Sequence, residues 1–267
     1  MKLQQPLEIP ITVARYGSKF YARELREGRP FALVRYGAGE WYRIVPNLPE
    51  WRKRTCPDPP QVPTELWTLW EHPWAAPVLR EGFVKAPHHP RYWLAIWHFD
   101  GMRRKGHLEY VMDFIVETGH ADREWHFGAV WQQAVRGDGM RVIVDALKAQ
   151  PLPLVLIGPH YLSPLLRLLP IHTHIPTHLA LSPIRDLPLL REKIFRAPRP
   201  AVYMFSASGI GKTIIQQLFP LLGEESFLID FGAAWDGYCG VTSRGYHREI
   251  TERKVRDTFG DRDDLPG

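Results

Sequence analysis

With 267 residues, 45% of them hydrophobic, the chain can bury a full core, and we expect one large domain. Pro, Arg and His interrupt every hydrophobic stretch, so we expect no membrane insertion. Met1–Pro6 lacks the apolar core of a signal peptide, and Cys56 and Cys239 lie far apart in the sequence. These features predict a cytoplasmic protein. The net charge of +5, mostly from arginine, favours an anionic partner such as a nucleotide or DNA, although a basic surface tuned for solubility would explain it equally well.

The first part of the chain predicts a mixture of helices and strands. Proline-rich residues 46–63 form a loop or insertion that carries the basic cluster Trp51-Arg-Lys-Arg54, and residues 99–106 form a basic loop bounded by glycine. We expect strands at 31–36, 92–97 and 153–158, and helices at 18–28, 64–72, 75–82, 107–118, 124–135 and 138–149.

The last third alternates more regularly between helices and strands. We expect helices at 161–169, 185–196 and 211–222, and strands at 174–181, 201–206 and 226–230. This alternation is typical of a single Rossmann-like α/β domain, with a mainly parallel twisted sheet and helices on both faces. We assign residues 1–245 to this domain and 246–267 to a charged tail, expected to be a surface helix that frays.

Three apolar strands run directly into glycine and polar residues. They are Phe31–Glu40, Leu154–Pro159 and Ala201–Lys212. Glycine lets a backbone approach a ligand closely, and ligands of parallel α/β folds bind beyond the carboxyl ends of the strands. The three strand ends are therefore predicted to line one crevice, together with Asp230 at the end of the last strand.

These segments, in this order, resemble the GT-D-type glycosyltransferases over about residues 20 to 240. The matching motifs are Arg-Tyr-Gly-Ala-Gly-Glu (35–40), Ile-Gly-Pro (157–159), Ser-Ala-Ser-Gly-Ile-Gly-Lys (206–212), Ile-Asp-Phe-Gly (229–232) and Trp-Asp-Gly-Tyr (235–238). Each motif is short, so their order and spacing carry the resemblance. One position departs from it: Ala38 stands where the family has the Asp of its Asp-X-Glu motif.

The resemblance implies a glycosyltransferase that uses a nucleotide-diphosphate sugar, with a UDP-sugar the first choice. Glu40 would hold Mn²⁺ or Mg²⁺, with weakened affinity and impaired activity because Ala38 supplies no second carboxylate. The implied catalytic residues are Glu40, Asp230 and Asp236. The implied donor-binding residues are Arg35, Gly37, Gly39, Gly158, Pro159, Ser206, Gly209 and Lys212, among which Arg35 and Lys212 would neutralise the diphosphate.

Simpler interpretations stay open for several of these residues. Asp230 or Asp236 alone is typical of a turn cap, and 206–213 is also consistent with a glycine-rich turn with an exposed lysine. The same segment nearly matches the P-loop pattern Gly-x-x-x-x-Gly-Lys-Thr, but Ser206 replaces the first glycine. A P-loop-like nucleotide-binding protein is thus an alternative. Arg123 is either a phosphate contact or a solvated helix start.

For the acceptor, the sequence favours a hydroxymethylated base in DNA, of the kind that viruses of bacteria glycosylate. Arg52, Lys53, Arg54 and the loop 102–106 would contact phosphates, and Trp41 or Trp97 would stack on an extruded base. A cell-surface glycan or glycoprotein is the alternative acceptor. A non-enzymatic nucleic-acid-binding module would share the basic clusters but would have no use for three glycine-rich strand ends.

Overall fold

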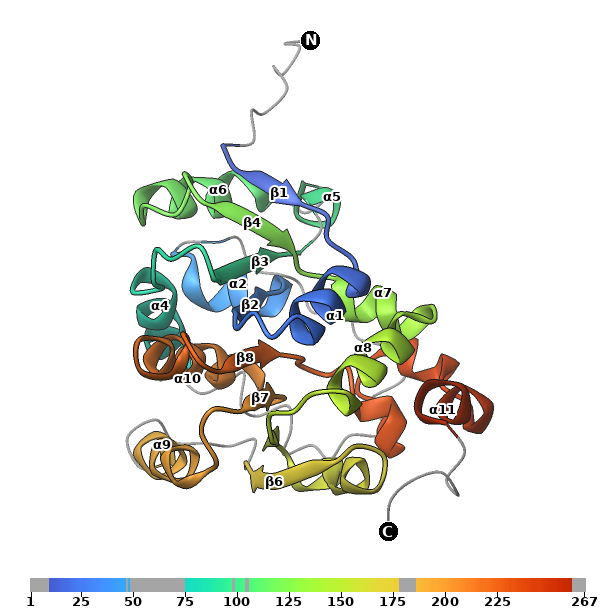
Figure 1. Cartoon of the computed structure of the whole chain (residues 1–267). Coiled ribbons are helices and arrows are strands. Elements are labelled where there is room, and N and C mark those ends of the chain that lie inside the picture. The colour runs from blue at the N-terminus through green and yellow to red at the C-terminus, as the bar shows by residue number, and fades with distance from the viewer. Residues whose placement is uncertain are drawn as a thin grey trace.

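The computed structural model describes residues 10–46, 48, 75–97, 99–103, 106–177 and 186–260. Eight strands form one sheet in the order β1-β4-β3-β2-β8-β7-β5-β6, and every pair in it is parallel. Figure 1 shows this sheet running from β1 at one edge to β6 at the other. The strands are β1 (Thr12–Ala14), β2 (Ala32–Tyr36), β3 (Tyr92–Ile96), β4 (Glu124–Phe127), β5 (Leu154–Gly158), β6 (Ile171–Pro176), β7 (Val202–Phe205) and β8 (Phe227–Asp230).

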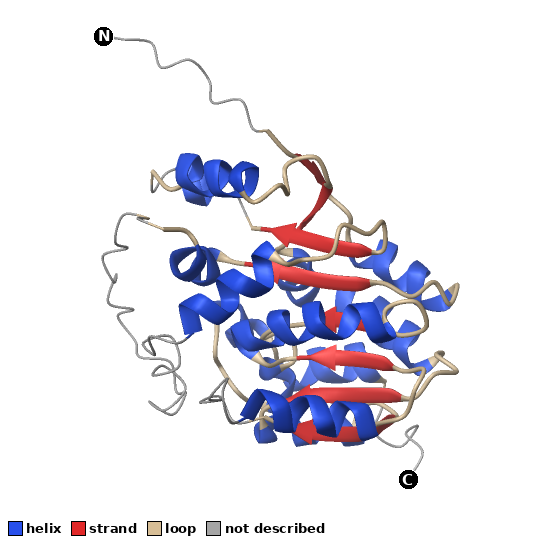
Figure 2. Cartoon of the chain, turned by 90° about the vertical axis from the view of Figure 1, so that its left-hand side faces the viewer, coloured by secondary structure: helices blue, strands red, loops and turns tan. Residues whose placement is uncertain are grey.

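Helices cover both faces of the sheet, as Figure 2 shows, which confirms the predicted α/β architecture. One face packs against α2 (Ala38–Ile44), α4 (Ala75–Val84), α5 (Phe99–Arg103), α6 (Leu108–Glu117), α9 (Asp186–Arg196) and α10 (Ser208–Leu222). The other packs against α1 (Ser18–Arg26), α7 (Val130–Arg136), α8 (Gly139–Lys148), α11 (Glu252–Phe259) and the 3₁₀ segments η2 (His160–Arg167), η3 (Asp236–Cys239) and η4 (Gly245–Glu249).

Strand β2 illustrates why the central strands are continuously apolar. Val34 and Tyr36 face one core, whereas Leu33, together with Phe31 just before the strand, faces the other. Successive side chains of a strand point to opposite faces, so a strand with helices on both sides needs apolar residues at every position. The exception is Arg35, which lies beside the carboxyl end of the strand.

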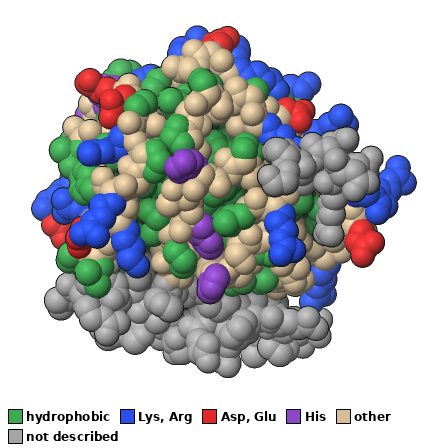
Figure 3. Space-filling model, turned by 60° about the horizontal axis from the view of Figure 1, so that its bottom comes forward, with side chains coloured by type: hydrophobic (Ala, Val, Ile, Leu, Met, Phe, Trp, Pro, Cys, Tyr) green, Lys and Arg blue, Asp and Glu red, His purple; other side chains and the backbone are tan. Residues whose placement is uncertain are grey.

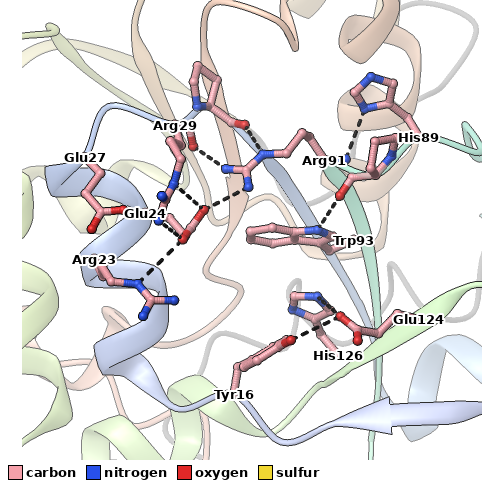
Figure 4. A network of polar contacts seen from close by, with 12 residues as sticks. Tyr16, Arg23, Glu24, Glu27, Arg29, His89, Arg91, Trp93, Glu124 and His126 are labelled. Carbon is pink, nitrogen blue, oxygen red and sulfur yellow. Dashed lines mark hydrogen bonds and ion pairs between the residues drawn. The ribbon is translucent and has the colours of Figure 1, made fainter.

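A polar network ties α1 to the amino ends of the strands, as Figure 4 shows. Glu24 on α1 is 3% exposed, and its oxygens lie 2.5 Å from Arg29 and 2.8 Å from Arg91. Arg91, just before β3, also donates to the Pro30 carbonyl oxygen at 2.9 Å. The network therefore stabilises the amino ends of the strands, opposite to the carboxyl ends where a ligand is expected.

Some elements differ from the sequence predictions. Residues 124–127 form strand β4 rather than the start of a helix, because they pair with β1 and β3, and the helix begins only at Val130. As a result Arg123 precedes a strand and donates to the Tyr92 carbonyl oxygen at the amino end of β3. It is therefore not a phosphate contact at the carboxyl edge. The expected loop at 99–106 begins with the short helix α5, and the expected helix at 161–169 is the 3₁₀ segment η2. Strand β6 starts at Ile171, before the predicted 174.

Other predicted segments fall wholly or in part on residues outside the described ranges, namely 47, 49–74, 104–105, 178–185 and 261–267. They include the helix at 64–72 and the cluster Arg52–Arg54. Within the described part of the chain, no helix has the length and apolar character needed to cross a membrane.

The segment after residue 245 packs on the domain as far as Gly260. It forms η4 and α11, and the Thr251 side chain caps α11 by accepting a hydrogen bond from the Lys254 amide at 3.2 Å. Phe259 is 2% exposed and packs against Trp235 and Tyr238.

Candidate functional site

Arg35 and Asp230 meet where β2 and β8 pair side by side. The Arg35 Nε atom donates to the Asp230 carbonyl oxygen at 2.7 Å, and its Nη1 atom donates to the Gly128 carbonyl oxygen at 3.2 Å. The Arg35 amide donates to Asp230 Oδ2 at 3.2 Å, and the Arg35 Nη2 atom lies 3.7 Å from Asp230 Oδ1. The arginine fork therefore joins the carboxyl edges of β2 and β8 and the residues just after β4.

Glu40 reaches the same place from helix α2, which begins directly after β2. Gly37 precedes the helix, and its amide donates to Glu40 Oε2 at 3.0 Å. A Cβ atom at Gly37 would lie 3.0 Å from Glu40 Oε2 and 3.6 Å from the Trp97 ring, so a larger residue there would crowd the carboxylate. Gly39 lies in the first turn of this helix. The glycine at 37 thus allows Glu40 to fold back over the strand end.

Lys212 on α10 joins the two carboxylates. Its Nζ atom lies 3.0 Å from Glu40 Oε1 and 3.3 Å from Asp230 Oδ2, and it donates to the Ser208 carbonyl oxygen at 3.4 Å. The Lys212 side chain is 4% exposed. Burial alone would lower the pKa of Lys212, but the charges of Asp230 and Glu40 raise it above its ordinary value. The ammonium group therefore stays charged between two carboxylates.

The junction of β7 and α10 lies beside the end of β5. Ser206 is 5% exposed, and its hydroxyl oxygen has no hydrogen-bond partner among the described residues. A Cβ atom at Gly158 would lie 2.8 Å from a Leu162 methyl carbon and 3.1 Å from the Ser206 Cβ atom, and one at Gly209 would lie 3.0 Å from Leu79. Close packing thus explains both glycines. Pro159 follows Gly158 and precedes η2.

The P-loop alternative does not fit this junction. A P-loop wraps its backbone amides around phosphates before its helix begins. Here only Ser206 and Ala207 separate β7 from α10, and Ser208–Thr213 are already helical. Ser208 has a φ of +54°, an uncommon value for a residue with a side chain. The exposed-lysine interpretation is also wrong, because Lys212 is buried.

Asp236 lies in a second polar cluster, on η3. It is 3% exposed and accepts hydrogen bonds from the Ser243 hydroxyl and from Tyr161. Burial raises the pKa of Asp236 to about 6, against the opposing effects of Ser243, Arg244 and Tyr161. Among the described residues, no hydrogen bond or ion pair joins Asp236 to Arg35, Glu40 or Lys212.

The sequence analysis missed Ser243 and Tyr161, the partners of Asp236, and also His247, which contacts Ser243. His247 accepts hydrogen bonds at Nδ1 from the Ser243 and Arg244 amides, both at 3.2 Å, and burial lowers the pKa of His247 to about 4. The imidazole is therefore neutral at pH 7. The spacing of Asp236, Ser243 and His247 was the available signal, but it matches no short catalytic motif.

The two aromatic candidates for stacking on a base differ in exposure. Trp41 is 1% exposed and packs among Tyr36, Phe83 and Trp125, so its predicted role is wrong. Trp97 is 38% exposed and follows β3 at the carboxyl edge, close to Gly37. It is thus the one of the two with a face available to a ligand.

The residues present do not fit the divalent cation that Glu40 was predicted to hold. Both Glu40 oxygens already have partners, the Gly37 amide and Lys212. A Mg²⁺ ion binds carboxylate oxygens at about 2.0–2.1 Å. Here the Lys212 ammonium group fills the space between Glu40 and Asp230, at 3.0 and 3.3 Å from their oxygens. Across the described ranges, no three His, Cys, Asp or Glu residues gather into a metal-binding group. Binding of Mn²⁺ or Mg²⁺ therefore stays a prediction from the sequence, one that the contacts of Glu40 do not favour.

Three solved structures share this architecture. A structure described as a new glycosyltransferase from Streptococcus sanguinis, in the domain of unknown function 1792, is 12% identical with a TM-score of 0.51, covering 85% of this chain and 83% of that chain. A second, described as the same domain with a distinct glycosyltransferase fold, is 10% identical with a TM-score of 0.53, covering 93% and 94%. A selenomethionine-substituted structure of this domain is also 10% identical, with a TM-score of 0.52.

At these identities the likeness shows the fold alone. No protein-family model and no curated protein sequence matches the chain. The protein therefore shares the fold of these three structures, one of which is described as having a distinct glycosyltransferase fold.

Proposed function

We propose that the protein is a glycosyltransferase that moves a sugar from a nucleotide-diphosphate sugar, first of all a UDP-sugar, to an acceptor hydroxyl. The observation that carries this proposal is the buried cluster of Arg35, Glu40, Lys212 and Asp230 at the carboxyl edge of the sheet. It gains support from the solved structure from Streptococcus sanguinis, which has the same fold and is described as a glycosyltransferase.

The chemistry needs positive charge beside the leaving diphosphate. Negative charge builds on that group as the sugar–phosphate bond breaks, and fixed cations lower the barrier. Arg35 and Lys212 supply such charge, and α10, 15 residues long, directs its first backbone amides toward the same strand ends. The hydroxyl of Ser206, just before this helix, has no partner in the described part of the chain and offers a further hydrogen bond to a phosphate oxygen.

We assign removal of the acceptor proton to Asp236. A general base works best when its pKa lies near the operating pH, and the pKa of Asp236 is about 6. Asp230 is less suited to this role because it lies against Arg35 and Lys212. Asp230 instead positions the Arg35 and Lys212 side chains.

Nucleotide binding tests the donor site directly. UDP, GDP and TDP, and their sugars, should raise the thermal unfolding temperature, whereas the matching monophosphates should have a smaller effect because they lack the leaving phosphate. Arg35→Met should abolish the shift, and exchange of the exposed Arg191 for Met should leave it unchanged. If no nucleotide diphosphate or sugar shifts the unfolding temperature of the wild-type protein, the donor site is refuted.

For the acceptor, we favour DNA with hydroxymethylated bases. The exposed Trp97 at the carboxyl edge supports it, since an aromatic face can stack on an extruded base. On the face that carries β6, Figure 3 shows Lys and Arg side chains around the periphery, with hydrophobic and histidine side chains between them. Among the described residues, Figure 3 shows no continuous basic stripe on that face.

Salt dependence discriminates between the acceptors. Binding to duplex DNA should weaken steeply as salt rises, and replacing Arg52, Lys53 and Arg54 with Gln should flatten this dependence. Trp97→Ala should weaken binding at every salt concentration without changing the slope, because it removes stacking but no charge. Undetectable DNA binding at low salt would favour the glycan or glycoprotein acceptor instead.

A further inference from the structure

The Lys212 side chain holds a position in which all three of its N–H groups have a partner. Two point to carboxylates, Glu40 at 3.0 Å and Asp230 at 3.3 Å, and the third points to the Ser208 carbonyl oxygen at 3.4 Å. The carboxylates come from α2 and β8, and the lysine comes from α10. One ammonium group thus joins α2, near the start of the chain, to α10 and β8 near its end, as a bound cation would.

The charges of the cluster balance. Arg35 and Lys212 bring two positive charges, and Glu40 and Asp230 bring two negative charges. These side chains are 16%, 4%, 14% and 3% exposed, respectively, so solvent screens their interactions weakly. A divalent cation added to this neutral cluster would leave uncompensated charge in a buried place, which is costly. It could bind both carboxylates only by displacing the ammonium group.

We propose that Lys212 serves in place of a divalent cation, so that the diphosphate of a nucleotide binds beside Lys212 and Arg35 without a metal ion. This inference rests on the proposed donor site and narrows its chemistry. The contact of Lys212 with the Ser208 carbonyl oxygen is the longest of the three. It is therefore the one that a phosphate oxygen would most readily replace, while both carboxylates keep the ammonium group in place.

The wild-type protein provides the first test. Its affinity for UDP, measured by calorimetry in excess EDTA and again with Mn²⁺, should be the same. Electron paramagnetic resonance of Mn²⁺ added to the protein alone should show no stoichiometric binding. Binding of UDP only when Mn²⁺ is present would overturn the inference and leave the proposed function standing. Absence of UDP, GDP and TDP binding under both conditions would overturn both.

Substitution of the lysine provides the second test. Lys212→Met keeps a long side chain but leaves the two carboxylates without a cation between them. We expect this variant to lose UDP binding in EDTA, to regain it with Mn²⁺, and to bind Mn²⁺ at least about tenfold more tightly than the wild type. Lys212→Arg is the matched control, since it keeps the charge and should gain no Mn²⁺ affinity.

A double variant shows whether the gained metal lies at this site. Glu40→Gln combined with Lys212→Met should lose the Mn²⁺ binding gained by the single variant. If Lys212→Met folds but gains no Mn²⁺ affinity, the ammonium group does not occupy a cation position, and the inference is wrong. The wild-type measurements decide the question by themselves if the variants do not fold.

Discussion

At the scale of single residues, Gly232 leaves the space that the Arg35 guanidinium group occupies. It lies two residues after Asp230 with a φ of +57°, and a Cβ atom there would overlap Arg35 Nη2. Gly240 has a similar φ of +80°, but a Cβ atom at Gly240 would meet nothing within 4 Å. Comparing substitutions at Gly232 and Gly240 therefore separates the cost of the backbone conformation from the cost of displacing Arg35.

We expect Gly240→Ala to lower the free energy of unfolding by about 1 kcal/mol, the cost of a left-handed conformation for a residue with a Cβ atom. Gly232→Ala should lower it by more and should also weaken nucleotide binding, because Arg35 must move away from the carbonyl oxygens of Asp230 and Gly128. Urea unfolding and calorimetry with UDP measure the two effects. Equal losses of stability with unchanged UDP binding would show that Arg35 tolerates the extra atom.

Asp236 should make stability depend on pH in an unusual direction. Its native pKa of about 6 lies above its ordinary value of 3.8, so between these values the native protein keeps a proton that the unfolded chain has released. The contribution of this group to stability therefore falls as pH rises from about 4 to 6, and the full penalty remains above pH 6.

Asp236→Asn removes this dependence. We expect its free energy of unfolding, relative to the wild type, to rise by on the order of 2 to 3 kcal/mol between pH 4 and pH 7. Urea unfolding of both proteins at several pH values measures the difference. A constant difference across this range would mean that Asp236 titrates normally. The variant should also lose transferase activity if Asp236 is the base.

At the scale of elements, the ion pairs of Glu24 with Arg29 and Arg91 link α1 to the amino ends of β2 and β3. Burial alone would raise the pKa of Glu24, but hydrogen bonds from Arg29 and Arg91 lower it below its ordinary value. A lowered native pKa contributes stability at neutral pH that is lost as the solution becomes acidic. The arginine side chains are 48% and 29% exposed, so water weakens the interaction.

Glu24→Gln should therefore destabilise the protein by about 1 to 2 kcal/mol at pH 7. The control is Glu27→Gln, because Glu27 also pairs with Arg29 but is 45% exposed, and its loss should cost less than about 0.5 kcal/mol. Chemical unfolding at pH 7 and again near pH 4 measures both, and the effect of Glu24→Gln should shrink at the lower pH. Equal effects for the two variants would contradict a special role for the buried carboxylate.

Strands with continuous apolar sequence were predictable, whereas β4 and the edge strand β1 were not. Residues 154–158 and 202–205 are buried on both faces, and only apolar side chains suit such strands. Glu124-Trp-His-Phe127 mixes polar and aromatic residues, and it becomes a strand only because β1 and β3 lie on either side of it. That pairing depends on residues more than 25 positions away, which local periodicity does not reveal.

The location of these charged and polar residues at the strand ends was predictable, but the ion pairs between them were not. Strand ends marked Arg35, Ser206 and Asp230, because parallel strands bring their carboxyl ends to one edge. That Lys212 lies between Glu40 and Asp230, instead of facing solvent, follows from the adjacency of β2 and β8 and from the packing of α10 over them. The sequence does not specify this strand order, so it could not show which charges would pair.

At the scale of the whole molecule, residues 246–260 contribute to the core. Phe259 on α11 packs against Trp235 and Tyr238, and Lys148 on α8 donates a hydrogen bond to the Phe259 carbonyl oxygen at 2.5 Å. The last helix therefore covers part of the core on the α8 face. A segment that frays independently would contribute little to global stability.

We expect Phe259→Ala to lower the global free energy of unfolding by about 3 kcal/mol or more, through lost burial and a cavity. Arg253→Ala on the same helix is the control: the Arg253 side chain is 86% exposed, and its loss should cost no more than about 0.5 kcal/mol. A urea transition followed by tryptophan fluorescence measures both. If Phe259→Ala unfolded at the same urea concentration as the wild type, α11 would fold and unfold independently of the domain.

The left-handed conformation of Ser208 has a consequence for engineering. A glycine at this position would avoid the strain of its φ of +54° and should raise the free energy of unfolding by about 1 kcal/mol, measurable as a higher thermal midpoint. The same substitution would loosen the backbone in front of α10, whose Ser208 carbonyl oxygen holds Lys212. The native sequence is therefore not the most heat-resistant version of this protein, and selection for heat resistance alone would be expected to alter a residue beside the proposed nucleotide site.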